Sequence, residues 1–592
     1  MFHQLKALLQ MPATHYGSKE IFRWLWAAWR GNRLQAVLNA AIGLVDVVVS
    51  LLQVSAVKHA IDVASGTEHG NLYVAVGIMG ALILSDFALN IAAVWVRNLL
   101  GIKAQNRMQQ AMLDRILRSE WRGRERMHSG DVLNRLEFDV NNVVTFLTET
   151  IPSALSVLAM FIGAFFYLFS MDWLLSIVTV AILPIFLAMS KIYVRQMRNL
   201  TRMVRDWDSK VQSTLQETIQ HRMLIKTLES DQVMVDRLED TQSELRRRVV
   251  NRTKFSVFSN LMVNFGFALG YLIAFLWAAV RMSMHTLSFG GMTAFLQLVN
   301  KIQNPARNLA KLIPAFVSVF TAAERLMELE EDPLEEQGDP IWVKAPCGLR
   351  LSHVSYAYDK VGGNVIDDLS FDFRPGTCTA VLGETGAGKT TIIRLLLALV
   401  KPQKGEIKIY EASPQNLQAS PQPLPEREGL SNSHSYAQIL TPLHRCNFVY
   451  VPQGNTLLSG TIRDNLLLGK LDATEEEMKT VLHLSCADFV FELPDGLDTV
   501  CSEQGGGLSE GQAQRIAIAR SLLRAYPSEQ LGRPGSSILV FDEATSALDP
   551  DTEQQLLQNI LSRHDKTVIF ITHRMAVTKY CDQVLKIEKI HH

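Results

Sequence analysis

Six long apolar stretches in the first half of the chain restrict its fold more than any other feature of the sequence. A helix that crosses the hydrocarbon core of a membrane needs about 20 mostly apolar residues, and each stretch comes close to that length or exceeds it. Buried helices of a soluble protein would rarely supply six such stretches within about 290 residues. The candidate spans are Leu34–Val57, Leu72–Val96, Ile151–Phe169, Trp173–Val194, Phe255–Val280 and Leu287–Val319.

Lysine and arginine residues are unevenly distributed between the candidate spans. The long segments Lys103–Arg135 and Lys191–Lys254 are rich in both, whereas the short loops at residues 62–71, 170–172 and 282–286 contain neither. Positively charged loops tend to remain on the cytoplasmic side of a membrane. We therefore predict a multi-pass protein of the inner (plasma) membrane, with the N-terminus, both long segments and the C-terminal domain in the cytoplasm.

The residues before the first candidate span are aromatic and basic. Residues 18–30 contain Phe22, Trp24, Trp26 and Trp29 among lysine and arginine side chains. Helices that combine tryptophan with basic residues favour the boundary between lipid and water. We expect a helix on the cytoplasmic membrane surface within an N-terminal region of residues 1–32.

The second half of the chain is typical of a soluble α/β domain and contains a phosphate-binding motif. The apolar stretch Thr377–Leu382 predicts a buried strand, which leads into Gly383–Thr390 and then an apolar helix. Glycines let the backbone N–H groups of such a loop surround phosphates, and the N-terminus of the next helix favours negative charge. Lys389 is placed to bind the β- and γ-phosphates of ATP, and the Thr390 hydroxyl is placed to bind Mg²⁺. The nucleotide-binding residues predicted here are Gly383, Glu384, Thr385, Gly386, Ala387, Gly388, Lys389, Thr390 and Thr391.

Two adjacent carboxylates follow a second apolar run. Ile538–Phe541 predicts a buried strand, which ends at Asp542 and Glu543. The end of such a strand presents its acids at the edge of a sheet, where phosphates bind. We predict that Asp542 holds Mg²⁺ through water and that Glu543 is the general base that polarises the attacking water.

The segment Leu508–Gln512, followed by Arg515–Arg520, resembles the signature sequence of ATP-binding cassette (ABC) proteins. Other motifs of that family occur in the usual order. Tyr358 matches the aromatic residue that stacks on adenine, Gln453 matches the glutamine that senses Mg²⁺, and His573 matches the switch histidine that contacts the γ-phosphate. The resemblance implies catalytic roles for Gln453 and His573. The signature residues that it assigns to ATP binding are Ser509, Gly511 and Gln512.

The resemblance extends over nearly the whole chain. Six spans fused to a C-terminal cassette are similar to an exporter-type half-transporter, such as the bacterial lipid-flipping and multidrug exporters. It implies a polytopic α-helical membrane domain with cytoplasmic extensions, coupling loops at Gly130–Asp139 and Gln212–Lys226, and an α/β P-loop NTPase domain that uses ATP and Mg²⁺. It also implies a dimer with a second half-transporter chain, in which Ser509 contacts the γ-phosphate bound by the partner subunit's Lys389.

The resemblance and the composition together predict the domain organisation. Residues 1–32 form the interfacial helix region, 33–327 the six-helix transmembrane domain, 328–347 a linker, and 348–592 the nucleotide-binding domain. Residues 411–445 are rich in Pro, Ser and Gln and predict a mobile insertion. The signature has Glu510 where glycine is commoner in the family, and the extra carboxylate near ATP could slow catalysis. No departure removes a catalytic group, so we expect both sites of a homodimer to be active.

The predicted function is ATP-driven export or flipping of a hydrophobic or amphipathic solute, a lipid or a drug, by alternating access. A peptide substrate is less favoured, because no peptidase-like domain precedes the spans. One alternative is a subunit of a heterodimeric exporter, and another is an ATP-regulated channel or regulatory subunit. Membrane lipids are expected partners. Nucleic acid is not, because a net charge of −1 lacks the usual basic footprint.

Ionisable residues within the candidate spans are the candidates for a substrate cavity. Asp46, Asp86 and Lys301 fall near the middle of their spans when about 1.5 Å is allowed for each helical residue. Either Lys301 pairs with one aspartate across the helices, or the three residues line a cavity and bind a charged head group. Arg307 and Lys311 lie further along the sixth span. They resemble the basic residues of lipid-flipping exporters, although basic side chains at helix ends also extend toward the membrane surface.

Overall fold

The computed structural model describes residues 16–121, 129–174, 176–177, 183–358, 363–384, 386–412, 437–501, 507–528, 530, 532–562 and 565–589, without the side chains of a few helical residues such as 183–195 and 305–314. The chain divides into two compact units. The first contains residues 1–113 and 129–330, and the second contains residues 114–128 and 331–592. Because the second unit includes a short piece of the N-terminal half, the two units are not simply consecutive in sequence.

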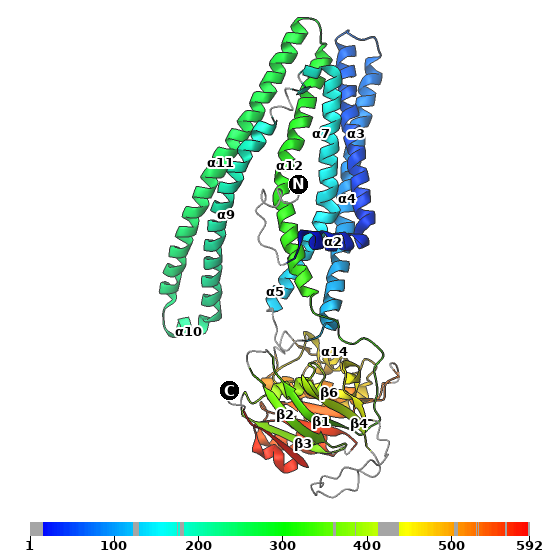
Figure 1. Cartoon of the computed structure of the whole chain (residues 1–592), viewed down its shortest axis with the longest axis vertical. Helices are drawn as coiled ribbons and strands as arrows, with labels where there is room; N and C mark the ends of the chain where they lie inside the picture. Colours follow the sequence, from blue (N-terminus) through cyan, green and yellow to red (C-terminus); the bar gives the residue numbers. More distant parts are fainter. Residues whose placement is uncertain are drawn as a thin grey trace. The chain divides into compact units, whose positions relative to one another are not determined.

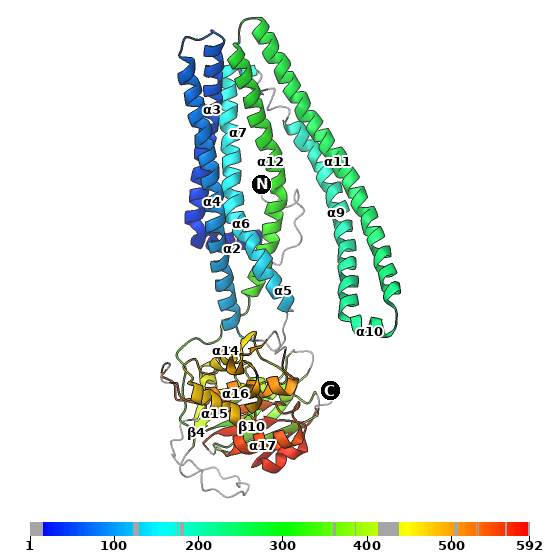
Figure 2. The ribbon, with the colours of Figure 1, turned by 180° about the vertical axis from the view of Figure 1, so that it is seen from behind.

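The first unit is built of helices. Figures 1 and 2 show α9 and α11 side by side as a long antiparallel pair joined by α10, while α3, α4, α7 and α12 form a separate group. The helices are α2 (Ser18–Trp29), α3 (Arg33–Ala64), α4 (Leu72–Arg118), α5 (Ser129–Asn134), α6 (Val140–Thr145), α7 (Ile151–Met171), α9 (Leu183–Gln220), α10 (Arg222–Thr227), α11 (Asp231–Ser283) and α12 (Phe289–Leu329). A helix therefore forms where the interfacial helix was predicted, and its Trp24 Nε1 donates to Glu330 at the end of α12 (2.8 Å).

Four of the described helices are long and apolar enough to cross a membrane. They are Arg33–Ala64, Leu72–Arg118, Gly130–Met171 and Asp231–Ser283, and they contain the first, second, third and fifth candidate spans. The prediction of six spans is not confirmed. The fourth candidate, Trp173–Val194, lies partly outside the described residues. The sixth forms α12, which is less apolar because polar and charged residues occur from Gln297 to Lys311.

Small side chains line the contacts among the helices of the first unit. Ala164 on α7, Ala278 on α11 and Ala294 on α12 are fully buried in one apolar cluster. Small residues let helices within a membrane approach closely and gain van der Waals contact. The approach of α3 to α7 is closer still, since a Cβ added to Gly43 would lie 2.1 Å from Ser156 Oγ.

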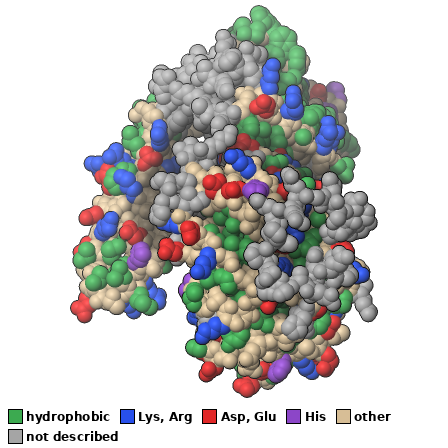
Figure 3. Space-filling view, turned by 60° about the horizontal axis from the view of Figure 1, so that its bottom comes forward, with side chains coloured by type: hydrophobic (Ala, Val, Ile, Leu, Met, Phe, Trp, Pro, Cys, Tyr) green, Lys and Arg blue, Asp and Glu red, His purple; other side chains and the backbone are tan. Residues whose placement is uncertain are grey.

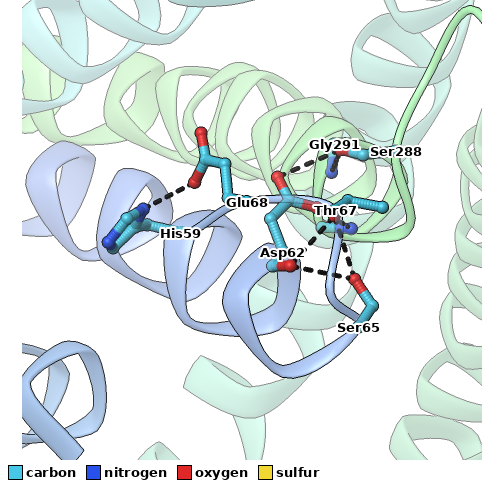
Figure 4. Close-up of polar contacts among 8 residues, drawn as sticks. His59, Asp62, Ser65, Thr67, Glu68, Ser288 and Gly291 are labelled. Atoms are coloured by element: carbon cyan, nitrogen blue, oxygen red, sulfur yellow. Dashed lines mark hydrogen bonds and ion pairs between the residues drawn. The ribbon is translucent and has the colours of Figure 1, made fainter. Parts of the chain in front are cut away.

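A buried carboxylate joins the end of α3 to the start of α12. Asp62 is 3% exposed. Its Oδ2 accepts from the Ser288 hydroxyl at 3.0 Å (Figure 4). Its Oδ1 accepts from the Gly290 N–H, also at 3.0 Å. A Cβ on Gly290 would lie 2.4 Å from the backbone oxygen of Lys58, so only glycine fits there. The carboxylate thus satisfies donors at the first turn of α12, which have no partner within their own helix.

The predicted coupling loop Gly130–Asp139 is not a loop. It forms α5 and a π-helical turn, Arg135–Asp139, within the first unit. Arg135 is buried and pairs with Asp131 (2.9 Å) and with Glu328 on α12 (2.7 Å). The charges in this segment are therefore used to attach it to α12. Residues 114–128, which include the last five residues of α4, group with the second unit.

The second unit contains two larger sheets and a short two-stranded one. An antiparallel sheet has the strand order β2-β1-β4-β5, and a parallel sheet has the order β11-β3-β10-β9-β6. The antiparallel strands are β1 (Cys347–Tyr356), β2 (Ile366–Phe373), β4 (Lys404–Glu411) and β5 (Ala437–Ile439). The parallel strands are β3 (Cys378–Gly383), β6 (Phe448–Val451), β9 (Ile538–Asp542), β10 (Thr567–Ile571) and β11 (Gln583–Ile587). The short sheet pairs β7 (Gly460–Thr461) with β8 (Val500–Cys501).

Both faces of the parallel sheet are buried, which explains the continuous apolar run of β9. Ile538 and Val540 face a core shared with β1 and with α13 (Lys389–Leu396). Leu539 and Phe541 face the opposite core, which is formed with α14 (Ile462–Leu467), α15 (Glu475–Leu484), α16 (Glu510–Arg524) and α17 (Pro550–Leu561). Successive side chains of a strand point to opposite faces, so a strand covered on both sides has no polar alternation. Each of these buried side chains contributes about 2 kcal/mol.

The ends of the predicted insertion, residues 411–445, are attached to the second unit. β5 pairs with β4, and Arg445 forms an ion pair with Glu335 (2.6 Å) while it also donates to the backbone oxygens of Leu397 and Ala398 at the end of α13. The middle of the insertion, residues 413–436, lies outside the described residues. The two ends of the predicted insertion are therefore part of the fold of the second unit.

The face of the molecule seen in the space-filling view carries both basic and acidic side chains. Figure 3 shows blue basic and red acidic side chains interspersed over the described part of the face in view. A face that binds nucleic acid is usually strongly basic. The described part of this face carries both signs of charge.

Candidate functional site

Four parallel strands end at one edge of the sheet, and a predicted site residue follows each of them. β3 leads into the loop that ends at Lys389, and β6 leads to Gln453. β9 ends at Asp542, followed by Glu543, and β10 leads to His573. The carboxyl ends of parallel strands meet at the same edge, which is where open α/β sheets bind ligands. Residues from four distant parts of the sequence are thereby brought to one place.

The loop between β3 and α13 depends on two glycines with left-handed backbone. Gly386 and Gly388 have φ values of +85° and +96°. A Cβ at Gly388 would also lie 2.9 Å from Ile366 Cδ1. This backbone turns the chain so that α13 begins at Lys389, with its N-terminus and the loop's N–H groups available for an anion. Thr385, in the same predicted motif, lies outside the described residues.

Three predicted site residues converge on Glu543. Its Oε1 lies 3.1 Å from Lys389 Nζ and 3.4 Å from His573 Nδ1. Its Oε2 accepts from Gln453 Nε2 at 3.1 Å. Glu543 has φ of +47°, uncommon for a residue with a side chain, and its N–H donates to Ile571 O at 2.9 Å. Strained backbone of this kind is concentrated at functional sites.

The two adjacent carboxylates have pKa values shifted in opposite directions. Burial and the nearby charge of Glu543 raise the pKa of Asp542. Burial also acts to raise the pKa of Glu543, but the hydrogen bonds and charges of Lys389 and His573 outweigh it, so its pKa lies below the ordinary range. Glu543 is therefore ionised at neutral pH, as a group that accepts a proton must be.

The residues at this edge fit a magnesium ion. Thr390, Gln453 and Asp542 offer a hydroxyl, an amide oxygen and a carboxylate, the hard oxygen donors that Mg²⁺ prefers. Among the described residues no group of three or more His, Cys, Asp or Glu side chains is arranged for a metal. Mg²⁺ is usually held by one or two carboxylates together with the phosphates of a nucleotide.

The predicted adenine-binding residue lies beside the phosphate-binding helix. Tyr358 follows β1, and its hydroxyl is 3.0 Å from Thr391 Oγ1. Arg394 Nη1 donates to the same hydroxyl at 2.6 Å. The ring of Tyr358 also meets that of Tyr356 edge to face, with 5.1 Å between the ring centroids. The position of the Tyr358 ring is thus fixed by contacts from both α13 and β1.

The signature residues form the N-terminal cap of α16. Ser509 Oγ accepts from the Gln512 N–H (3.2 Å), and Gln512 Oε1 accepts from the Ser509 N–H (2.9 Å). This reciprocal pair is a capping box. A Cβ on Gly511 would lie 2.9 Å from the Ala547 oxygen, so glycine is required for the close approach of the segment after β9. Ser509 and Glu510 remain exposed at the surface of the unit.

Sequence motifs did not identify two residues that touch this site. Tyr450 donates from its hydroxyl to Asp542 Oδ2 (3.2 Å), and Arg394 holds Tyr358 as described. Tyr450 lies within β6 and Arg394 within α13, and neither belongs to a motif that the sequence analysis used. An arginine five residues after Lys389, on the helix that follows the loop, was the only available signal for Arg394.

Three of the predicted cavity residues, Asp46, Asp86 and Lys301, lie near one another in the first unit. Lys301 on α12 donates to Ser50 on α3, and its charge acts on both Asp46 and Asp86. One carboxylate oxygen of Asp46 is buried with no hydrogen-bond partner. Among these described side chains Lys301 forms no direct ion pair with either aspartate, so the first of the two arrangements considered for these residues does not occur. The side chain of Arg307 lies outside the description.

Comparisons with known proteins identify ABC transporter sequences in both halves of the chain. A family described as the ABC transporter transmembrane region matches residues 36–306, and one described as ABC transporter matches residues 366–546. An ATP-dependent lipid A-core flippase of Bordetella avium (strain 197N) is 25% identical over 590 residues, covering 96% of this chain and 91% of the relative. Antigen peptide transporter 2 of Mus musculus is 27% identical over 494 residues, covering 82% of this chain and 65% of the relative.

A solved structure shares the fold. A bacterial Atm1-family ABC exporter with ATP bound superimposes with a TM-score of 0.71 at 20% identity, covering 95% of each chain. The two family matches lie in the two units and together span most of the chain. The chain belongs to the ABC transporter family, and joins a helical transmembrane domain to an ABC nucleotide-binding domain whose ATP hydrolysis drives export or flipping across a membrane.

Proposed function

We propose that this chain moves a hydrophobic or amphipathic solute, a lipid or a drug, across the bacterial inner membrane as one half of a dimer that alternates its access. The observation that supports this most directly is the convergence of Lys389, Gln453 and His573 on Glu543. A chain that only regulated a channel would not need this catalytic set intact. The nucleotide-binding domain and the chain's N-terminus would be cytoplasmic, because the basic segments lie on that side of the spans.

The hydrolytic roles follow from position and charge. Lys389 and the N–H groups around Gly386 and Gly388 would bind the β- and γ-phosphates of ATP. Glu543, ionised and exposed only in part, would polarise the attacking water. His573, beside Glu543 Oε1, would contact the γ-phosphate.

The other predicted residues at this edge would bind Mg²⁺ and the adenine ring of ATP. Thr390, Gln453 and, through water, Asp542 would hold Mg²⁺, which supplies charge neutralisation between the β- and γ-phosphates. The ring of Tyr358 would stack on the adenine. Glu384, Thr385, Ala387 and Thr391 would complete the contacts of the loop and the first turn of α13 with the nucleotide.

A second chain would complete each ATP site. The exposed Ser509 and the N-terminus of α16 present a hydroxyl and free backbone donors, which suit a phosphate. In a head-to-tail dimer, Ser509, Gly511 and Gln512 of one subunit would contact the nucleotide bound by the partner subunit's Lys389. We favour a homodimer, because the single cassette lacks none of the catalytic groups in its described part.

The substrate proposed is an amphipathic lipid or drug. A similar protein from Bordetella avium is named for flipping lipid A-core, and most of the spans of this chain expose apolar side chains. Asp46, Asp86 and Lys301 would face a charged head group in the membrane interior. Arg307, further along α12, is the proposed basic contact near the cytoplasmic end.

Purified chain reconstituted in lipid vesicles tests this proposal. ATPase activity would be measured against a panel of lipids and amphiphilic drugs, with Glu543→Gln as the inactive control. The proposal predicts that the wild type hydrolyses ATP alone and that one class of amphiphile changes the rate. No ATPase activity from the single chain, with activity restored by a related chain, would instead assign it to a heterodimer. Steady ion conductance without ATP hydrolysis would identify a channel.

A further inference from the structure

A tryptophan three residues after the end of α4 lies against the helix that follows the phosphate-binding loop. The Cζ atom of Arg394 lies 4.1 Å from the ring centroid of Trp121. At this distance a guanidinium group and an indole face form a favourable cation–π contact. Trp121 also packs against the apolar core that β1 shares with α13. The contact is therefore partly buried, and both residues belong to the second unit.

Arg394 connects this tryptophan to the proposed adenine-binding ring. Its Nη1 donates to the Tyr358 hydroxyl at 2.6 Å, and Thr391 Oγ1 lies 3.0 Å from the same oxygen. Arg394 Cζ is 5.7 Å from the Tyr358 ring centroid, beyond close stacking. The guanidinium therefore stacks on Trp121 and bonds to the edge of Tyr358. The phenol oxygen is held from α13, and that fixes the direction in which the ring faces.

The backbone before Trp121 is fastened to the strand-like segment that follows α12. The Glu120 N–H donates to Pro333 O at 2.8 Å, and the Glu335 N–H donates to Arg118 O at 2.9 Å. The Glu120 carboxylate also pairs with Lys401 (2.9 Å). The backbone that leads into Trp121 is thus held by three contacts, which positions the ring beside the guanidinium.

We propose that Arg394 is a positioning residue that orients Tyr358 for stacking on the base of ATP, and that Trp121 holds Arg394 in place. The proposal rests on the proposed ATP site. It makes the affinity for ATP depend on Trp121, which stands three residues after the end of α4, a helix whose earlier residues belong to the first unit. A change at the end of this helix would then alter base stacking while the phosphate contacts stay as they are.

The contributions of the adenine ring and of the phosphates to ATP binding can be measured separately. A residue that acts through Tyr358 affects binding of a ligand with adenine, whereas Lys389 affects any ligand with a triphosphate. Magnesium tripolyphosphate and a non-hydrolysable ATP analogue are therefore the two probes. Both would be titrated calorimetrically into the full-length chain reconstituted in lipid.

Arg394→Gln should weaken binding of the ATP analogue about three- to tenfold, the range of one lost hydrogen bond of ordinary strength. Its binding of tripolyphosphate should be unchanged. Tyr358→Phe, which keeps the ring, should have a similar effect, and the double variant should be no weaker than either single variant, because both remove the same bond. In steady-state hydrolysis the KM for ATP should rise while kcat stays constant.

The Trp121 contact has its own pair of variants. Trp121→Leu should weaken binding of the ATP analogue, and Trp121→Phe, which keeps an aromatic face, should weaken it less. Arg350→Gln is the matched control, because Arg350 makes the same kind of contact with Tyr410 on another part of the domain (5.1 Å). This control should leave both ligands unaffected. Arg394→Lys keeps the positive charge but loses the planar guanidinium group. It should therefore also weaken binding of the ATP analogue.

Two results would overturn the inference. One is an equal loss of ATP analogue and tripolyphosphate binding in folded Arg394→Gln and Arg394→Lys, which would assign Arg394 to the phosphates. The other is unchanged binding of both ligands in these variants. If Lys389→Ala binds both ligands like the wild type, the proposed ATP site itself is wrong, and that result is distinct from either outcome at Arg394.

Discussion

Lys389 Nζ lies 3.1 Å from Glu543 Oε1, although 154 residues separate the two in sequence. The pair joins the residue proposed to bind the phosphates to the residue proposed to activate water. Both side chains are largely buried, with 12% and 17% of their surfaces exposed. A γ-phosphate bound by Lys389 would compete for its ammonium group and release Glu543 toward water. ATP binding would thus prepare its own general base.

Removing the carboxylate of Glu543 should stop hydrolysis and leave binding intact. Glu543→Gln keeps the shape of the side chain but cannot accept a proton, so kcat should fall about 10²- to 10⁴-fold. The affinity for ATP should stay the same or increase, because no negative charge remains beside the phosphates. Glu492→Gln, at an exposed position of the same domain, is the control and should keep full activity. Activity within about twofold of the wild type in Glu543→Gln would remove Glu543 from the catalytic role.

The stability of the nucleotide-binding domain should depend on pH through Glu477. Burial acts to raise the pKa of Glu477, but Lys470 and the Thr474 N–H outweigh it, so the pKa of the folded state lies below the ordinary range. The stabilisation is therefore present above the pKa of the unfolded chain and is lost as the pH falls through the lower, folded-state pKa.

Thermal unfolding checks this relation at a series of pH values. Glu477→Gln should lower the melting temperature by a constant amount above about pH 5, and the difference from the wild type should shrink below that. Glu492→Gln should show no such difference. A gap between wild type and Glu477→Gln that widens as the pH falls would contradict the assigned direction of the pKa shift.

The junction of α3 with α12 should depend on Asp62. Asp62→Asn would replace an acceptor by a donor beside Gly290 N–H or the Ser288 hydroxyl, leaving a buried donor unsatisfied at a cost of about 1–3 kcal/mol. Thermal unfolding of the reconstituted chain should occur at lower temperature. Glu68→Gln is the control, since its pair with His59 is half exposed and such pairs contribute about 0–1 kcal/mol. Equal effects of the two substitutions would argue against a special role for the buried carboxylate.

Substitution of Lys301 should change substrate binding more than it changes formation of the dimer. Lys301→Met removes the charge that acts on Asp46 and Asp86, and it should shift the concentration of amphiphile that half-maximally changes ATPase activity by more than about twofold. The yield of dimer, measured by size-exclusion chromatography, should match that of the exposed control Lys404→Met. A lower yield of dimer with an unchanged half-maximal concentration would assign Lys301 to a structural role.

Local motifs were predictable from the sequence because strand, loop and helix follow one another within a few residues. The path from β3 through Gly388 to α13 is an example, and so are the acids after β9. The contacts of Trp121 with Arg394 and of Tyr450 with Asp542 were not predictable. Their partners are separated by more than 90 residues and meet only because the fold brings them together.

Two expectations for the first unit differ from the structure. The family resemblance implied a loop at Gly130–Asp139, but the segment is helical, and its charges pair with one another and with residues of α12. In α12, the polar residues near Lys301 lower its apolar character, so the length of the apolar run alone did not settle whether it spans a membrane. Tertiary pairing of charges cannot be read from local composition.

Translocation in sealed vesicles tests the central claim most directly. Chain reconstituted with a fluorescent amphipathic lipid would be given ATP on the side of its nucleotide-binding domain, and the lipid in each leaflet would be measured by chemical quenching. The account predicts movement of lipid to the opposite leaflet with wild type and ATP, and none with Glu543→Gln or without Mg²⁺. Equal rates for wild type and Glu543→Gln would contradict it, because movement would then not depend on hydrolysis.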